Sequence, residues 1–252
     1  MSHILAIANQ KGGVGKTTTA INLGAGLGAF ERRVLLVDCD PQGNATRGLG
    51  GWPTAPHLYH ALMGEVPLTA AIRPSGFPNL DIVPSGRDLV GVEVEFVGRP
   101  GWEGTLKGVL AEVADRYDTV LIDCPPSLGH LTVSALTAAD GILVPLQCEY
   151  FALEGVSELL ATVERVQGGL NPQLEIAGIL LTMYDDRTNL SRDVAEEIRR
   201  HFADKVYETV VPRNIRLAEA PSHGLPIFQY DIKSRGAEAY LALAREFLRR
   251  AA

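Results

Sequence analysis

The stretch NQKGGVGKTT, residues 9–18, follows an apolar run at residues 4–8 and opens a segment with helical spacing at residues 17–30. Its three glycines let the backbone turn amides toward phosphate oxygens, and the N-terminus of a helix adds a favourable dipole. Lys16 can then reach the β- and γ-phosphates of a nucleotide, and Thr17 can ligate Mg²⁺. The order of strand, glycine loop and helix predicts a phosphate-binding P-loop.

One position departs from the standard P-loop pattern, which places a glycine five residues before Gly15. This chain has Gln10 there, and a second lysine, Lys11, follows it. We expect the rest of the loop to bind the nucleotide, through Gly12, Gly13, Val14, Gly15, Lys16, Thr17 and Thr18.

Two further apolar runs, residues 34–37 and 119–122, end in acidic residues. Asp38 and Asp40 follow the first run and Asp123 follows the second, and the carboxyl ends of parallel strands face one crevice. Asp123 fits a Walker B pattern, in which the carboxylate holds Mg²⁺ through a water molecule. One of the first two carboxylates could instead cap the turn that follows it.

The fold follows from the alternation of strand and helix patterns. Near-continuous apolar runs separated by amphipathic segments predict a mostly parallel, twisted sheet in a three-layer α/β/α sandwich. We expect a single domain over residues 1–252, without an appended helix-turn-helix, and a surface excursion at residues 48–78. The remaining expected strands are 80–83, 142–146 and 176–181, and the remaining expected helices are 106–116, 153–168 and 191–202.

Composition narrows the class of protein. The 252 residues carry a net charge of −7 and three cysteines without a CxxC pair, so neither a disulfide framework nor a zinc site is indicated. The chain shows no signal sequence and no apolar run of about 20 residues, which predicts a cytoplasmic protein without stable membrane association. Basic residues outnumber acidic ones only from residue 187 onward.

The KGGVGKTT segment resembles the deviant Walker A motif of the ParA/MinD superfamily. Resemblance to the chromosomal ParA (Soj-like) branch extends over nearly the whole chain. It is carried by DPQGNAT (40–46), DCPPSLG (123–129), QCEYFALEG (147–155), LLTMYDDRTNLS (180–191), VPRNIRLAEAPSHGLPI (211–227) and SRGAEAY (234–240). Where relatives commonly have DPRSRG, this chain has DIKSRG, and residues 50–100 match only loosely.

The resemblance implies a deviant P-loop ATPase that uses Mg²⁺ and ATP and forms a homodimer in the ATP state. Lys11 is then expected to contact the nucleotide of the partner subunit, and Lys16 to neutralise phosphate charge. Asp40 is expected to orient the attacking water, while Asp38 and Asp123 support the metal with Thr17. By the same analogy, Pro212 and Asn214 lie near the adenine.

The resemblance also implies chromosome or plasmid partitioning. In this family the ATP-bound dimer binds double-stranded DNA without sequence specificity, and a centromere-binding ParB protein stimulates slow hydrolysis to release it. Arg187 and Arg216 match the DNA-binding arginines of the family, which predicts association with the nucleoid. Weaker candidates for DNA contact are Lys205, Arg213, Lys233 and Arg235.

Three other classes remain open on the sequence. A MinD-like membrane-associated ATPase needs a C-terminal amphipathic helix, but the stripe at Tyr240, Leu241, Ala244, Phe247 and Leu248 favours core packing. An iron–sulfur protein related to the nitrogenase iron protein needs cysteines placed to bridge a cluster, which Cys39, Cys124 and Cys148 are not. A scaffold without catalysis is disfavoured because all three acidic residues at the strand ends are retained.

Overall fold

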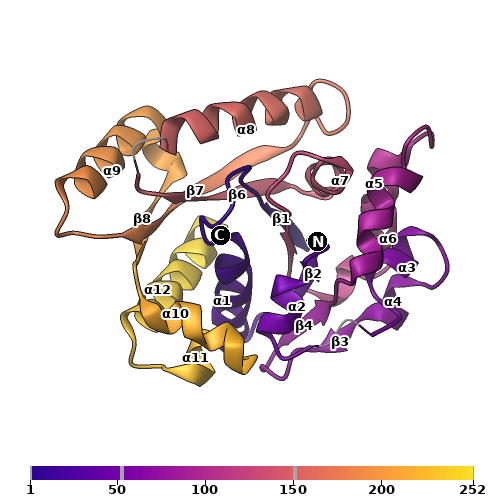
Figure 1. The fold of residues 1–252 in the computed structure, drawn as a ribbon, viewed down its shortest axis with the longest axis horizontal. Helices are drawn as coiled ribbons and strands as arrows, with labels where there is room; N and C mark the ends of the chain where they lie inside the picture. Colours follow the sequence, from indigo (N-terminus) through magenta and orange to yellow (C-terminus); the bar gives the residue numbers. More distant parts are fainter. Residues whose placement is uncertain (1, 52–53, 150–151, 252) are drawn as a thin grey trace.

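The computed structural model describes residues 2–51, 54–149 and 152–251. Within these ranges the strands form one eight-stranded sheet in the order β3-β4-β2-β5-β1-β6-β7-β8 (Figure 1). All neighbouring strands pair in parallel except β3 and β4. The strands are β1 (His3–Ile7), β2 (Val34–Asp38), β3 (Arg73–Pro74), β4 (Leu80–Val83), β5 (Thr119–Asp123), β6 (Gly141–Gln147), β7 (Glu175–Tyr184) and β8 (Val206–Pro212).

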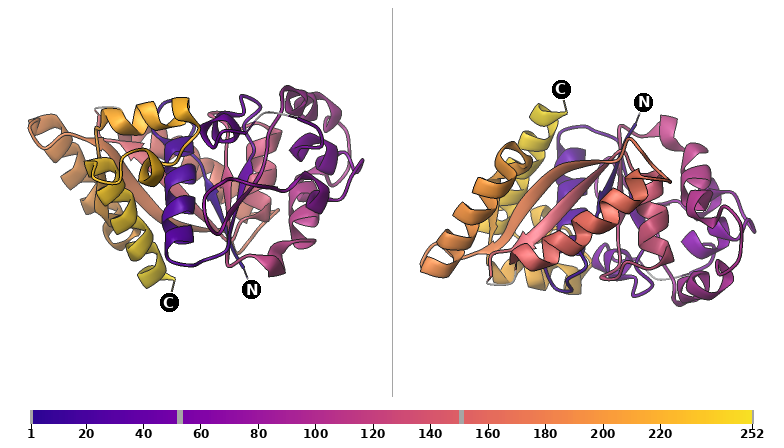
Figure 2. Two further views of the ribbon diagram at one scale, coloured as in Figure 1. Left: turned by 90° about the horizontal axis from the view of Figure 1, so that it is seen from below. Right: turned by 90° about the horizontal axis from the view of Figure 1, so that it is seen from above.

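Helices cover both faces of the sheet. α1 and α12 lie side by side on one face, whereas α8 and α9 cross the other (Figure 2). The α-helices are α1 (Lys16–Ala29), α2 (Asn44–Gly48), α3 (Leu58–Leu62), α4 (Leu68–Ala71), α5 (Val92–Glu95), α6 (Thr105–Ala111), α7 (His130–Ala138), α8 (Ala152–Gln167), α9 (Asn189–Phe202), α10 (Ile215–Glu219), α11 (Ile227–Tyr230) and α12 (Arg235–Arg250). Two separate cores fill the spaces between sheet and helices. The predicted three-layer α/β/α sandwich is confirmed.

The central strands confirm the expected elements to within a few residues. Every residue of β2 and of β5 is buried, as expected for parallel strands that are covered on both faces. β8 was not predicted, because it lies at the edge of the sheet and carries the exposed Glu208, which interrupts the apolar pattern. The helix expected over 106–116 is wrong at its end, since α6 stops at Ala111 and a 3₁₀ turn, Ala114–Arg116, follows.

Residues 48–78 contain more structure than a surface excursion. Helices α3 and α4 bury Leu58, Leu62 and Leu68 in the core that also holds α6 and α7. The segment then returns to the sheet as β3, which pairs antiparallel with β4. The expectation was therefore wrong in part, because the short apolar fragments of this stretch cover the edge of the sheet.

The C-terminal helix α12 packs against α1. Gly26 of α1 allows a close approach, since a Cβ atom at this position would lie 2.9 Å from Cβ of Ala244. The Tyr240 hydroxyl lies 3.1 Å from Oγ1 of Thr19, and Phe247 is buried in the same core. Core packing of the predicted stripe is confirmed for Tyr240, Ala244 and Phe247, whereas Leu241 is exposed. In the described part of the chain, no helix is long and apolar enough to span a membrane.

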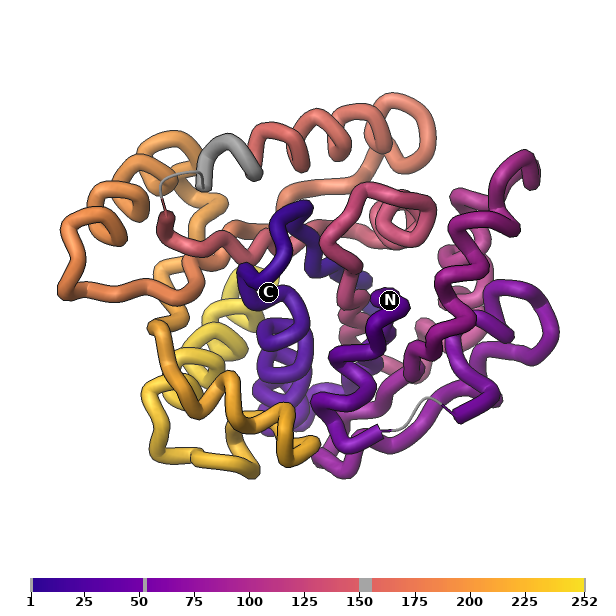
Figure 3. The backbone as a smooth tube through the Cα atoms, in the orientation of Figure 1, coloured from indigo at the N-terminus to yellow at the C-terminus, as the bar shows by residue number. Residues whose placement is uncertain are grey.

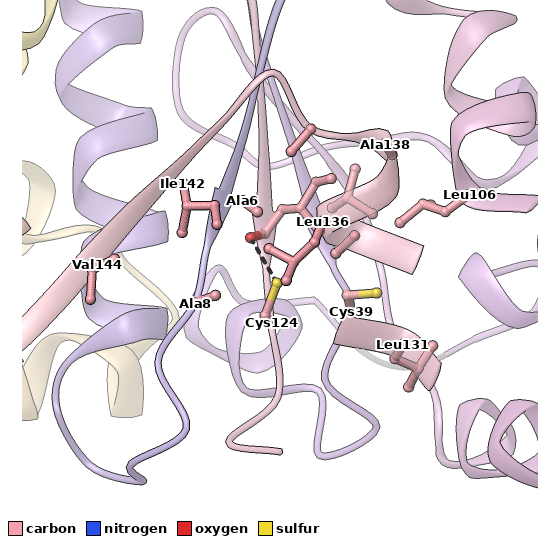
Figure 4. Packing of buried hydrophobic residues seen from close by; sticks show 14 of the residues in the cluster. Ala6, Ala8, Cys39, Leu106, Cys124, Leu131, Leu136, Ala138, Ile142 and Val144 are labelled. Carbon is pink, nitrogen blue, oxygen red and sulfur yellow. Dashed lines mark hydrogen bonds between the residues drawn. The ribbon is translucent and has the colours of Figure 1, made fainter. Parts of the chain in front are cut away.

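The cysteines lie inside the molecule. Cys39 and Cys124 follow β2 and β5 and are buried among Ala6, Leu131 and Leu136 (Figure 4). Burial raises the pKa of both thiols above the ordinary value, so they stay protonated. Two residues of the QCEYFALEG stretch, Tyr150 and Phe151, lie outside the described residues.

Candidate nucleotide and metal site

The glycine loop joins β1 to α1 near the centre of the molecule (Figure 3). Gly13 and Gly15 have φ angles of 76° and 90°, values that side chains with a Cβ rarely adopt. Asn9 holds the start of the loop, since its Nδ2 donates to the Pro145 carbonyl at 2.8 Å and its Oδ1 accepts the Lys11 amide at 2.9 Å. The chain therefore fixes a loop whose amides lie at the N-terminus of a long helix.

Two adjoining cavities open beside this loop. The first, of about 600 Å³, is lined by Gly12, Gly13, Gly15, Lys16, Thr17 and Thr18 of the loop and by residues such as Asp40, Asn44 and Pro126. The second, of about 380 Å³, is mainly apolar and includes Pro212 and Asn214 in its wall. Gly15, Thr18, Met183, Leu217 and Ala218 line both. A polar compartment joined to an apolar one suits a phosphorylated ligand with a flat ring.

Lys16 is the cation of the polar cavity. Its side chain is largely buried, and Nζ donates to the backbone carbonyl of Lys11 at 2.9 Å. Burial lowers the pKa of Lys16, while the nearby carboxylates Asp123 and Asp40 act in the opposite direction. The ammonium group is thus held close to where the loop amides converge.

Asp38 and Asp123 lie opposite each other on the paired strands β2 and β5, and both are fully buried. Oδ2 of Asp38 accepts the amide of Thr46 at 2.7 Å and its hydroxyl at 2.6 Å. Neither carboxylate oxygen of Asp123 has a partner at regular hydrogen-bond geometry, although the Thr17 hydroxyl lies close enough to lower its pKa. Burial raises the pKa of both groups, that of Asp38 to about 6, and the charge of Asp38 raises the pKa of Asp123 further.

Asp123 fits a magnesium ion better than Asp38 does, because its oxygens have no partner at regular hydrogen-bond geometry and Asp38 is occupied by Thr46. Among the residues that the structure describes, no group of three His, Cys, Asp or Glu could hold a metal ion by itself. Mg²⁺ keeps several waters and commonly binds one or two protein oxygens together with substrate phosphates, so one carboxylate beside Thr17 is a sufficient protein contribution.

Asp40 lines the polar cavity near the start of the loop that joins β2 to α2. Its Oδ1 accepts the amide of Gln42 at 2.9 Å, and its carbonyl accepts the hydroxyl of Ser85 at 2.7 Å. Its backbone and one carboxylate oxygen are thereby fixed. The turn-capping role that the sequence left open for one aspartate applies to both, since Oδ1 of Asp38 accepts the Asp40 amide at 3.3 Å and Oδ1 of Asp40 accepts the Gln42 amide.

Lys11 is directed differently from Lys16. Its side chain is 43% exposed, forms an ion pair with Glu149, and is not among the described residues that line either cavity. The two lysines of the loop, five residues apart, therefore have separate surroundings.

Arg187 and Arg216 lie on the surface, away from the polar cavity. Arg187 follows β7, and Arg216 is in the first turn of α10, next to the Asn214 cap. Neither arginine lines the polar cavity, but Asn214 and Leu217, on either side of Arg216, line the apolar cavity, and Leu217 lines the polar one as well.

Three residues of the site were not singled out from the sequence. Thr182 donates its hydroxyl to the Val14 carbonyl at 2.8 Å and so ties the glycine loop to β7. Met183 has a φ of 50° and lines both cavities, and Arg47 lines the polar one. Thr182 and Met183 lie within the LLTMYDDRTNLS stretch, so the resemblance marked this segment without indicating that it contacts the nucleotide loop.

The glycine loop, the buried lysine and the acidic strand ends of a parallel sheet together define a P-loop nucleoside triphosphatase. A family model described as an AAA domain matches residues 2–176. The chromosome partitioning protein ParA of Caulobacter vibrioides is 55% identical over 252 residues, which cover 98% of this chain and 94% of that protein. The chain belongs to the ParA/Soj family of chromosome-partitioning ATPases.

Other relatives and solved structures are similar over nearly the whole chain. The sporulation initiation inhibitor protein Soj of Bacillus subtilis is 54% identical and covers 98% of both chains. A solved structure titled cobyrinic acid a,c-diamide synthase, from Mycobacterium smegmatis with bound ADP and magnesium, is 42% identical with a TM-score of 0.88, covering 100% of this chain and 96% of that one. The cell division ATPase MinD of Pyrococcus furiosus is 28% identical with a TM-score of 0.82, covering 100% of both. The protein is an ATPase that uses ATP and Mg²⁺.

Proposed function

We propose that the protein is a partition switch whose ATP-bound dimer binds double-stranded DNA without sequence specificity and releases it after hydrolysis. The observation that carries this proposal is the position of Lys11, which lies outside its own phosphate cavity and is half exposed. A lysine of the phosphate loop that does not serve its own cavity can reach the nucleotide of a second subunit once its ion pair with Glu149 opens.

Each site residue receives a role within this switch. Lys16 and the loop amides hold the β- and γ-phosphates, and Asp40 orients a water molecule for in-line attack on the γ-phosphorus. The bond to the bridging oxygen breaks, and ADP leaves with the electron pair. Thr17 and Asp123 would hold Mg²⁺, which neutralises charge on the phosphates when bound, and Asp38 fixes the loop that carries Asp40.

The partner lysine explains why hydrolysis should depend on assembly. With Lys11 in trans, charge on the transferred group is fully neutralised only in the dimer, so a single subunit hydrolyses ATP slowly. Pro212 and Asn214 would enclose the adenine in the apolar cavity that they line. A ParB-type protein would raise the rate, and the DNA-bound state would place the protein on the nucleoid.

DNA binding is assigned to Arg187 and Arg216. Both belong to the part of the chain in which basic residues outnumber acidic ones, and both guanidinium groups are exposed. Contacts to phosphates explain binding that ignores sequence and weakens steeply with salt. The membrane alternative is less well supported, because the apolar stripe of α12 is mostly buried against α1.

The test is binding of the Asp40→Ala protein, which should retain ATP, to a non-specific DNA duplex with ATP, with ADP and without nucleotide. We expect the Asp40→Ala protein to bind DNA with ATP only, and to lose this binding at high salt. Adding Arg216→Glu to Asp40→Ala should abolish the binding. Arg32→Glu is the matched control, because Arg32 is equally basic and exposed but lies in the turn after α1. If the protein bound DNA in no nucleotide state but bound anionic liposomes with ATP, the proposal would be wrong and a membrane-associated ATPase would be favoured.

A further inference from the structure

Both arginines assigned to DNA are held by carboxylates of the same chain. Nε and Nη2 of Arg187 donate to Oδ1 and Oδ2 of Asp185 at 2.8 and 2.7 Å, a two-pronged pair. Nη1 of Arg216 donates to Oε2 of Glu219 at 2.8 Å, and its Nε lies 3.4 Å from Asp231. The groups that should meet DNA are therefore already paired within the subunit.

The pairing has a chemical consequence. A guanidinium group presents a planar fork of donors that matches a carboxylate or a phosphate in the same way. The Asp185 carboxylate thus occupies the Nε–Nη2 edge of Arg187, one of the two edges on which a guanidinium group can hold a phosphate in two-pronged fashion. The bonds from Arg187 lower the pKa of Asp185 to about 2, so this carboxylate stays charged at all physiological pH values.

We propose that Asp185 and Glu219 are internal competitors of DNA, which occupy on Arg187 and Arg216 the positions that DNA phosphates take. This inference rests on the proposed function and deepens it, since it names what blocks the DNA-binding residues in the subunit without nucleotide. DNA then binds where these pairs open, and the carboxylates set how strongly binding depends on ATP.

The surroundings of Arg187 provide room for a phosphate. A cavity of about 680 Å³ lies between the end of β7 and the start of α12, and both Arg187 and Asp185 line it. Arg213 and Arg235 line the same cavity from other elements, and in the described residues neither guanidinium has an ion-pair partner. The acidic Asp186 and Glu238 also line it, so the cavity favours an anion only where a carboxylate gives way.

The first pair is connected to the nucleotide site through β7. Thr182 is bonded to the glycine loop at Val14, and Met183, in a left-handed conformation that is costly for a residue with a Cβ, lines both nucleotide cavities. Asp185 follows two residues later. A nucleotide that displaces Met183 moves the segment that carries the Asp185 carboxylate.

The second pair is connected through the loop after β8. Asn214 lines the apolar cavity, and its Oδ1 accepts the amide of Arg216 at 2.9 Å. Arg213, beside it, lines both the apolar cavity and the cavity of Arg187, and its amide donates to the Tyr184 carbonyl at 3.1 Å. Nucleotide in the apolar cavity therefore touches the segments that carry both arginine pairs.

The experiment compares Asp185→Asn with Asp186→Asn in DNA binding without nucleotide, with ADP and with ATP. Both changes raise the net charge by one, but only Asp185 bonds the Arg187 side chain, and asparagine can still accept the Arg187 amide that Oδ1 accepts now. We expect Asp185→Asn to raise the affinity for a DNA duplex without nucleotide about five-fold more than Asp186→Asn. Glu219→Gln should act in the same direction on Arg216.

Equal effects of the two variants, with ATP-dependent DNA binding intact in the wild type, would overturn the inference and leave the proposed function standing. Absence of DNA binding in the wild type and in both variants would overturn both. ATP affinity, measured with a fluorescent ATP analogue, should not fall in either variant, because neither residue lines a nucleotide cavity, and it should rise in Asp185→Asn if nucleotide and the Arg187 pair are coupled.

Discussion

Two buried carboxylates, Asp123 and Glu246, have opposite surroundings. Asp123 at the end of β5 is fully buried, and neither of its oxygens has a partner at regular hydrogen-bond geometry. Glu246 of α12 is 5% exposed and accepts the amides of Glu208 and Thr209 and the guanidinium of Arg250, at 2.8, 2.9 and 2.8 Å. A buried charge is costly unless it is paired, so Glu246 is complete within the chain and Asp123 is complete only with a ligand.

The pKa values of the two carboxylates are shifted in opposite directions. Burial alone would raise the pKa of Glu246, but hydrogen bonds from Thr209 and Glu208 and the charge of Arg250 outweigh it and hold this pKa below its ordinary value. For Asp123 burial and the neighbouring Asp38 raise the pKa well above the ordinary value. Glu246 therefore joins α12 to the edge strand β8, whereas Asp123 lies buried behind the cavity wall, close to Lys16 and Thr17, which line the cavity.

The largest expected effect lies on the ligand-dependent side of this comparison. Replacement of Lys16 by alanine removes the ammonium group of the polar cavity, and we expect the rate of ATP hydrolysis to fall about 100-fold or more. The rate of ATP hydrolysis is measured as phosphate release at saturating ATP. Lys107→Ala, an exposed lysine of α6, is the control and should keep the wild-type rate. A Lys16→Ala protein with more than half of that rate would contradict the assignment.

The second largest effect is expected at Glu246, the carboxylate that is paired within the chain. Replacement of Glu246 by glutamine puts an amide where two backbone N–H groups and Arg250 need an anion, and should reduce the free energy of unfolding at pH 7 by about 2 kcal/mol. Because the folded pKa of Glu246 is depressed, its contribution is present above pH of about 4.5 and is lost as pH falls through the folded value. The difference between variant and wild type should therefore shrink on acidification.

Urea unfolding at several pH values measures this difference. Glu208→Gln is the matched control, since Glu208 pairs with Arg249 on the surface at 3.3 Å and its loss should change stability by no more than about 0.5 kcal/mol. A difference for Glu246→Gln that stays constant down to pH 3 would mean that its charge does not contribute.

The two sides of the comparison also differ in how far sequence predicts them. Lys16, Asp40 and Asp123 could be placed in one crevice because a glycine loop and the carboxyl ends of parallel strands meet at one edge of a sheet. Glu246 gave no signal, because its donors come from backbone amides of β8, an edge strand that the apolar pattern did not reveal. The pairing of Arg187 with Asp185 was equally hidden, since adjacent charges in a sequence do not show which will bond.

The smallest expected effect separates a ligand site from a structural one most directly. Asp123→Asn replaces a buried carboxyl group, whose ionisation is opposed by burial and by Asp38, with a neutral amide, so at a pH where the carboxyl is charged the ligand-free protein should become more stable by about 1 kcal/mol. The same variant should lose most of the stabilisation that a non-hydrolysable Mg·ATP analogue gives the wild type, because a ligand stabilises the fold only where its concentration exceeds its Kd. Thermal unfolding with and without the analogue measures both changes in stability.

Asp38→Asn is the contrasting variant, since Asp38 accepts two bonds from Thr46 and its loss should destabilise the ligand-free protein. If Asp123→Asn also destabilised the ligand-free protein, Asp123 would be a structural residue like Glu246, and the metal role would have to move to another oxygen of the cavity.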